Sequence, residues 1–331
     1  MKITVIGAGA WGTALAISLA ANHRVTLWAR NAGQVEAMRG ARSNQRYLPG
    51  IPLPADLELS ADLPAALADA ELAIVAVPTS AFRTTLQLLA RSSGNFGVVW
   101  VCKGFEAETS LLPHQVVAEV LPARFSYGVL SGPSFALEVA RGLPTALTLA
   151  STDVEFARST ALALHHAHLR IYASSDLVGV EVGGAVKNVM AIAAGICDGM
   201  GLGHNARAAL LTRGLAEIAR LGLKLGGTSE TFSGLSGVGD LILTCTGDLS
   251  RNRQVGLLLA QQHDLPEILR RLGHVAEGVY TVREVHQLAQ RLDVAMPICE
   301  AVYRILYEHI PVSDVITALL SRAPTQEFDG D

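Results

Sequence analysis

Short and nearly uninterrupted apolar runs alternate with helix-like stretches over roughly the first 175 residues of the chain. Runs of this kind predict strands buried on both faces, as in a parallel sheet covered by helices. We expect such strands at residues 3–6, 24–29, 72–77, 97–102, 127–130, 145–149 and 169–172. The first part of the chain is therefore predicted to be an α/β domain, with a mostly parallel sheet and helices on both faces.

The strand pattern ends near residue 176, and apolar residues then recur at spacings of three and four, which predicts helices. We expect them at residues 207–225, 253–262, 265–272, 281–292 and 297–309, after a long apolar stretch at 177–197. That stretch carries Glu181 and Lys187, which oppose insertion into a membrane, so it is read as a buried helix with no integral membrane segment. The resulting prediction is an α/β domain at 1–180, an all-α domain at 181–331 and a loose tail at 324–331.

Three glycines, Gly7, Gly9 and Gly12, lie between the first expected strand and a helical stretch at 13–20. In a dinucleotide-binding motif the first glycine permits a tight turn and the second lets a pyrophosphate approach the backbone. The third lets the helix pack closely on the sheet, and the phosphates then meet free N–H groups at the helix N-terminus. A glycine-rich turn in any α/β protein is the alternative. The position between strand and helix favours a Rossmann-type domain that binds a dinucleotide.

The end of the second expected strand bears on which dinucleotide binds. An Asp or Glu usually stands there and binds the ribose 2′-hydroxyl, whereas this chain has Arg30 followed by Asn31. A guanidinium can pair with a 2′-phosphate that a carboxylate would repel. The sequence therefore allows NADP(H) and favours it, unless Arg30 is only a solvated surface residue.

Composition narrows the classes of partner. The 331 residues carry a net charge of −4, from 26 basic and 30 acidic residues, and no long basic run, which argues against a nucleic-acid partner. Four dispersed cysteines, without a Cys-x-x-Cys pair, argue against a disulfide framework and a zinc site and suit a reducing cytosol. Because Met1 and Lys2 lead straight into a strand, we expect no leader and a cytoplasmic protein.

Loops at the carboxyl ends of the expected strands are where an open α/β sheet binds ligands. Three of them stand out, at residues 77–80, 103–105 and 131–135. Lys103 leaves the end of a buried strand, where its charge can reach a phosphate or a carbonyl, although a solvated turn lysine would look the same. The histidines at 165, 166 and 168 lack acidic partners, so we expect no metal there.

Lys187 lies in a stretch of small and aliphatic residues at 181–196, which predicts a tightly enclosed helix. Burial would lower the pKa of its amine toward the range useful for proton transfer, and a nearby carboxylate would keep the proton on. Asp240 follows a glycine-rich turn and could be that carboxylate. The alternatives are a lysine that reaches out to water and an aspartate that only caps a helix.

A third candidate site is the run Ser250, Arg251 and Asn252, which reads as a helix start. It would bring together a hydroxyl, a guanidinium, an amide and backbone N–H groups. This combination suits a phosphate group on a substrate.

The chain resembles the bacterial-type NAD(P)-dependent glycerol-3-phosphate dehydrogenases over nearly its whole length. The resemblance rests on the segments at residues 7–16, 47–50, 131–136, 186–189, 234–241 and 250–252. Departures from the family pattern are His204 and Thr79, and they affect only local loop contacts. In that family dihydroxyacetone phosphate is reduced reversibly to sn-glycerol 3-phosphate, which supplies phospholipid synthesis.

The resemblance also implies residue roles. Lys187 would donate and accept the proton at the C2 oxygen, with Lys103 and Asp240 as its catalytic partners. Substrate binding would involve Lys103, Gly132, Ser134, Lys187, Asn188, Asp240, Thr244, Ser250, Arg251 and Asn252. NADP(H) or NAD(H) would contact Gly7, Gly9, Ala10, Trp11, Gly12, Arg30, Lys103, Ala136, Arg251 and Glu277. The expected partner is a small phosphate-bearing substrate, no metal is implied, and the oligomeric state is left open, a homodimer included.

Two other functions remain open from the sequence. One is a two-domain dehydrogenase that acts on a 3-hydroxy acid, and the other is a dinucleotide sensor without turnover. Oxidation of NADPH that depends on the substrate would separate all three.

Overall fold

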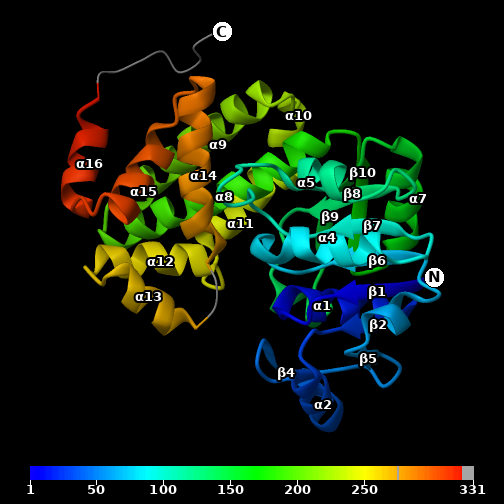
Figure 1. Cartoon of the computed structure of the whole chain (residues 1–331). Coiled ribbons are helices and arrows are strands. Elements are labelled where there is room, and N and C mark those ends of the chain that lie inside the picture. The colour runs from blue at the N-terminus through cyan, green and yellow to red at the C-terminus, as the bar shows by residue number, and fades with distance from the viewer. Residues whose placement is uncertain (274–275, 323–331) are drawn as a thin grey trace.

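An eight-stranded sheet forms the first part of the molecule (Figure 1) in this computed structural model, which describes residues 1–273 and 276–322. The strand order is β10-β9-β8-β7-β6-β1-β2-β5, and all neighbouring pairs are parallel except β8 and β9. The strands are β1 (Lys2–Ile6), β2 (Arg24–Trp28), β5 (Glu58–Ser60), β6 (Leu72–Val75), β7 (Gly97–Trp100), β8 (Tyr127–Ser131), β9 (Thr145–Ala150) and β10 (Leu169–Ser174).

Helices cover both faces of this sheet, as expected from its apolar strands. One face packs against α1 (Ala10–Ala20), α2 (Ala32–Ala41) and α7 (Val154–Leu164), through Leu15, Met38 and Ala161 among others. The other face packs against α3 (Leu63–Leu67), α4 (Phe82–Ala90) and α5 (Pro113–Val120). The predicted fold class is thus confirmed for the first part of the chain.

The remaining part is helical, and the described residues after Ser174 contain no strand. Its helices are α8 (Leu177–Gly199), α9 (Gly203–Lys224), α10 (Ser229–Phe232), α11 (Asp240–Thr246), α12 (Arg251–Ala260), α13 (Leu265–Leu272), α14 (Glu277–Leu292), α15 (Pro297–Tyr307) and α16 (Val312–Leu320). They gather beside the sheet, with α16 farthest from it (Figure 1). The all-α character predicted for this part is confirmed.

Helix α8 is the centre of the helical part and contacts α9, α11, α12 and α14. By length and composition it could cross a membrane, but 94% of its most apolar window is buried inside the structure. The backbones of α8 and α12 nearly touch, since a Cβ on Gly195 would lie 2.0 Å from the carbonyl oxygen of Arg253. Small residues in α8 therefore permit the close packing that the sequence predicted.

Several boundaries and small elements differ from expectation. Helix α13 has the predicted bounds, whereas α9 begins four residues earlier than predicted and α12 lies two residues earlier. The sequence did not predict β5, the two-stranded sheet of β3 (Ser43–Asn44) and β4 (Leu48–Pro52), α10 or α16. β3, β5 and α10 have only two to four residues each, too few to show a period. The expected tail at 324–331 lies outside the described residues.

Helix α8 runs without a break through the predicted boundary at 180/181. Leu177 and Val180 of its first turn pack with the sheet, whereas residues from Val182 onward belong to the core of the helical part. The division into domains at 1–180 and 181–331 stays a prediction.

Candidate active site

The glycine-rich turn between β1 and α1 has the geometry of a phosphate cradle. Gly7 has a φ of +115°, and a Cβ on it would lie 2.5 Å from the carbonyl oxygen of Ala76, so only glycine fits. At Gly9 a Cβ would meet nothing within 4 Å, which leaves the approach to the backbone open. Helix α1 begins at Ala10 without a side-chain cap. Its N-terminus can therefore receive the pyrophosphate of a dinucleotide.

Two amide side chains hold this turn in place, and the sequence analysis missed both. The Asn44 amide donates to the carbonyl oxygen of Ala8 at 3.0 Å and to Thr13 Oγ1 at 2.8 Å, and it is fully buried. The Gln34 amide donates to the same Ala8 oxygen at 2.9 Å. Neither residue stands at a recognisable motif position, and their partners lie 26 to 36 residues away.

Three other predicted cofactor residues, Trp11, Arg30 and Ala136, lie in or next to elements that adjoin the turn. Arg30 follows β2 and is exposed, while the next residue, Asn31, caps α2 by accepting a hydrogen bond from the backbone N–H of Gln34 at 3.0 Å. Trp11 is half-buried in α1, and Ala136 begins α6 (Ala136–Ala140), which contacts α1. The Arg30 guanidinium thus stands at the strand end where an acidic residue would have excluded NADP(H).

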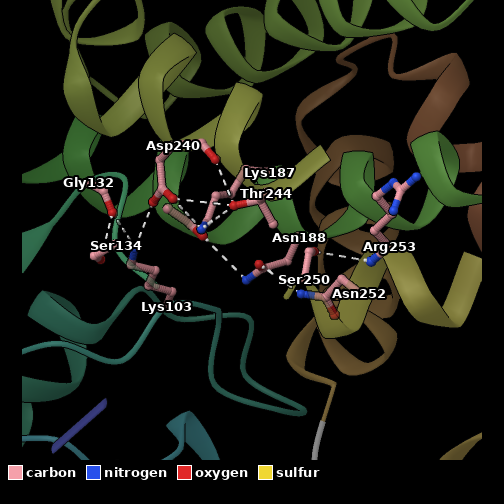
Figure 2. A network of polar contacts seen from close by, with 11 residues as sticks. Lys103, Gly132, Ser134, Lys187, Asn188, Asp240, Thr244, Ser250, Asn252 and Arg253 are labelled. Atoms are coloured by element: carbon pink, nitrogen blue, oxygen red, sulfur yellow. Dashed lines mark hydrogen bonds and ion pairs between the residues drawn. The ribbon is translucent and has the colours of Figure 1, made fainter. Parts of the chain in front are cut away.

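Lys187 and Asp240 meet at the centre of the site (Figure 2). Lys187 Nζ donates to Asp240 Oδ1 at 2.5 Å and to Thr244 Oγ1 at 2.8 Å, and the Lys187 side chain is only 8% exposed. Thr244 lies one turn beyond Asp240 on α11, so a single helix supplies both partners. The sequence alternative in which Lys187 reaches out to water is wrong.

Asp240 does not cap its helix, because Gly239 occupies that position and Asp240 is the first helical residue. A π-helical turn at Leu235–Gly239 leads into α11, so the chain enters the helix without a break and the Asp240 carboxylate is free to face the lysines.

Lys103 reaches the same carboxylate from the sheet. Its Nζ donates to Asp240 Oδ2 at 2.6 Å and to the carbonyl oxygen of Gly132 at 3.1 Å. The hydroxyl of Ser134 donates to that Gly132 oxygen at 3.0 Å. Loops after β7 and β8 thus meet α8 and α11 at one point, and Figure 2 shows the residues facing one another.

The charges in this cluster shift one another's protonation. Burial, opposed in part by Asp240 and aided by Lys103, lowers the pKa of Lys187 to about 8. Burial works against ionisation of Asp240, but the two lysines outweigh it and hold the pKa of that carboxyl below its usual range. At neutral pH Lys187 is therefore protonated and close to its titration point, as a proton donor for an alkoxide should be.

An amide pair extends the site along α8. Asn252 Nδ2 donates to Asn188 Oδ1 at 2.9 Å, and Asn252 Oδ1 accepts from the backbone N–H of Gly278 at 3.1 Å. These bonds join α8, α12 and the start of α14 directly beside Lys187 (Figure 2).

The predicted phosphate residues share one helix start but do not all face one point. The Ser250 hydroxyl caps α12 by accepting from the backbone N–H of Arg253 at 3.3 Å, and the Arg251 side chain is exposed. The guanidinium of Arg253, two residues on, is instead held by Asp198 at 2.8 and 2.9 Å. Arg251 is thus the arginine left available to a ligand.

Glu277 lies at the start of α14. Burial raises the pKa of its carboxyl, whereas Arg251 and the backbone N–H of Thr79 favour the charged form. Arg251 and Glu277 are therefore close enough to interact, as two residues at one cofactor would be. The sequence suggested no metal at the histidines at 165, 166 and 168, and in the structure the His166 ring is hydrogen-bonded to the Ser18 hydroxyl at 2.9 Å. Within the described residues no group of three or more metal-ligating side chains comes together.

Comparison with known proteins identifies relatives along the whole chain. The family model for the N-terminus of NAD-dependent glycerol-3-phosphate dehydrogenase matches residues 2–157, and that for its C-terminus matches 176–317. The chain is 62% identical to glycerol-3-phosphate dehydrogenase [NAD(P)+] of Thiobacillus denitrificans, over 99% of this chain and 100% of that protein. It is 60% identical to the protein of the same name from Nitrosomonas eutropha, with the same coverage.

A solved structure agrees with the sequence relatives. The crystal structure of glycerol-3-phosphate dehydrogenase from Coxiella burnetii superposes with a TM-score of 0.92 at 42% identity, over 97% of this chain and 98% of that one. Since both family models and these relatives cover the chain from the glycine-rich turn to α16, it belongs to the NAD-dependent glycerol-3-phosphate dehydrogenase family.

Proposed function

We propose that this protein reduces dihydroxyacetone phosphate reversibly to sn-glycerol 3-phosphate with NADPH or NADH. The observation that carries the proposal is the buried Lys187–Asp240 pair, which lies with Lys103 beside the carboxyl ends of the strands. That is where an open α/β sheet binds its ligands.

Lys187 is the general acid of the reduction. A ketone that accepts a hydride at C2 becomes an alkoxide, and the protonated amine of Lys187 delivers the proton to that oxygen. Asp240 holds the amine at 2.5 Å and so fixes its direction. In the reverse reaction the neutral amine takes the proton from the hydroxyl.

Lys103 contributes positive charge where the oxyanion forms. Its ammonium group shares Asp240 with Lys187, so two cations lie around a single carboxylate. The pair stabilises negative charge that develops in the transition state, in a place from which water is largely excluded.

The substrate phosphate binds at the N-terminus of α12. Arg251 supplies an exposed guanidinium there, and Asn188 and Asn252 supply amides next to Lys187. Remote binding of the phosphate orients a three-carbon substrate that offers few other contacts. Gly132 and Ser134 lie beside Lys103, since the Gly132 oxygen accepts from both Lys103 and Ser134.

The dinucleotide is held by the turn at Gly7, Gly9 and Gly12 and by the N-terminus of α1, with Arg30 at the adenosine end. When bound, the nicotinamide cofactor supplies the hydride for reduction at C2. We further place the protein in the cytoplasm, where it would supply glycerol phosphate for phospholipids. All four cysteines are free and buried, which suits a reducing compartment.

The test is oxidation of NADPH by the purified protein in the presence of dihydroxyacetone phosphate, followed by its absorbance. We expect turnover with the phosphate ester and far less with dihydroxyacetone, because Arg251 has no partner in the latter. Turnover only with a 3-keto acid would replace the proposal with a 3-hydroxy-acid dehydrogenase. Binding of NADPH without turnover of either substrate would indicate a sensor.

A further inference from the structure

Helix α8 carries a buried carboxylate, Glu181, that lies outside the cluster around Lys187. Glu181 has a side chain only 2% exposed, and it accepts three hydrogen bonds. Its Oε1 accepts from Trp100 Nε1 at 3.1 Å and from the backbone N–H of His114 at 2.9 Å, and its Oε2 lies 2.5 Å from His114 Nδ1. A buried carboxylate is expensive without such partners, so these bonds fix its position firmly.

The partners of Glu181 belong to the sheet part of the molecule. Trp100 is the last residue of β7, three residues before Lys103, and His114 lies in the first turn of α5. Glu181 therefore ties α8 to the strand that delivers Lys103. Trp100 is itself fully buried and packs against Phe82, with ring centres 5.8 Å apart, so this anchor is rigid.

The proton donor, Lys187, lies farther along the same helix. Glu181 precedes Lys187 by six residues of one continuous helix, a rise of about 9 Å. Because the helix is continuous, a displacement of its first turns also displaces Lys187. The separation of Lys187 from Lys103, and hence the way both share Asp240, depends on how α8 is seated against β7.

We propose that Glu181 is a positioning residue, which seats α8 on β7 and thereby places Lys187 against Asp240 and Lys103. The expected effect on turnover rests on the proposed function, whereas the expected effect on the position of Lys187 does not. What matters is the hydrogen-bond geometry rather than the charge. An amide oxygen at Oε1 could accept from both Trp100 and His114, and the amide nitrogen could donate to a neutral His114 ring.

The kinetic test compares three variants of the full-length protein. In Glu181→Met the three bonds are lost, and kcat should fall about tenfold to hundredfold, as expected for a small misplacement of a catalytic group. Glu181→Gln should stay near the parent value. Trp100→Phe removes one donor but keeps an aromatic ring, so it should give an intermediate loss even if Glu181→Met does not fold.

The readout that separates positioning from mere destabilisation is the primary isotope effect with NADPH deuterated at the transferred hydrogen. Misplacement slows the chemical step, so the isotope effect on kcat should rise, while KM for NADPH changes less than about twofold. The matched control is Glu217→Met. Glu217 is also a buried carboxylate, but it accepts from the backbone N–H groups of Ile298 and Cys299 at 2.7 and 3.2 Å, away from the site. It should lose stability and keep the parent isotope effect.

A readout independent of substrate is the rate at which an amine-directed reagent, trinitrobenzenesulfonate, modifies Lys187, measured by mass spectrometry. Loosening of the Lys187–Asp240 contact should speed modification in Glu181→Met and not in Glu217→Met. Lack of turnover by the parent protein would defeat the proposed function and leave this measurement standing. Parent-like labelling together with a parent-like isotope effect in Glu181→Met and Trp100→Phe would overturn the inference, as would a Glu181→Gln variant as impaired as Glu181→Met.

Discussion

Lys187 Nζ lies 2.5 Å from Asp240 Oδ1, although 53 residues separate the two in sequence. The second oxygen of the same carboxylate is 2.6 Å from Lys103 Nζ, so one buried anion serves two cations. The positive charge that Lys103 brings to this buried place assists burial, the main cause, in lowering the pKa of Lys187. It also creates a site that attracts an anionic substrate.

The first prediction concerns Lys187→Met, which keeps most of the side-chain volume and removes the amine. We expect turnover of dihydroxyacetone phosphate to fall by ~10²–10⁴-fold, as is typical when a general acid is lost. NADPH binding should be unchanged, because the glycine-rich turn lies on other elements. Steady-state rates and a fluorescence titration with NADPH measure the two effects. If turnover stays within a few-fold of the parent, Lys187 only packs the core and Lys103 becomes the leading proton donor.

The second prediction is a pH dependence with opposite signs in the two directions. Burial lowers the pKa of Lys187 to about 8. Reduction needs the protonated amine, so its kcat/KM should fall by about tenfold per pH unit above that value. Oxidation of glycerol 3-phosphate needs the neutral amine and should rise toward the same value. A reduction profile that is flat through pH 8 and beyond would contradict the assignment of Lys187 as the acid.

The third prediction concerns the exposed Arg251. Replacing it with Ala removes a charge-assisted hydrogen bond of about 1.5–3 kcal/mol, so KM for dihydroxyacetone phosphate should rise by about 10-fold or more. KM for the cofactor should change much less. Arg253→Ala is the matched control, because Arg253 is held by Asp198 and its loss should lower the melting temperature while leaving KM alone. If Arg251→Ala changes only stability, the phosphate binds elsewhere.

The fourth prediction concerns Arg30, which replaces the usual acidic residue at the end of β2. Arg30→Ala should raise KM for NADPH more than KM for NADH, because only NADPH carries the 2′-phosphate. Initial rates with each cofactor at saturating dihydroxyacetone phosphate give the comparison. Equal changes for both cofactors would mean that Arg30 does not recognise that phosphate.

Local patterns predicted those features whose causes are local. The turn at Gly7 and Gly9 was recognised because strand, glycines and helix follow one another within the first 20 residues. Helix α13 was predicted at its observed bounds from apolar residues at spacings of three and four. In the structure Asp264 caps it and Gly273 ends it in a left-handed conformation. The antiparallel pairing of β8 with β9 was not predicted, because strand direction is set by the path of the chain between them and not by the residues of either strand.

The candidate site shows the same limit. Burial of Lys187 could be predicted from its small neighbours. The hydrogen bonds that the Arg253 guanidinium donates to Asp198 could not, since 55 residues separate the two. Whether Arg251 or Arg253 is free depends on which face of α12 meets α8. The hydrogen bond from Asn44 to the glycine-rich turn could not be predicted for a similar reason, because its partner Ala8 lies 36 residues before it.

Helix α8 also bears on how the molecule unfolds. Its first turn completes the core on one face of the sheet and its later turns complete the core of the helical part. Neither core is whole without it, and it is a single hydrogen-bonded helix that cannot be divided between them. Melting of either part removes the support of the other. The chain should therefore unfold in one cooperative transition, and fragments cut within α8 should not fold independently.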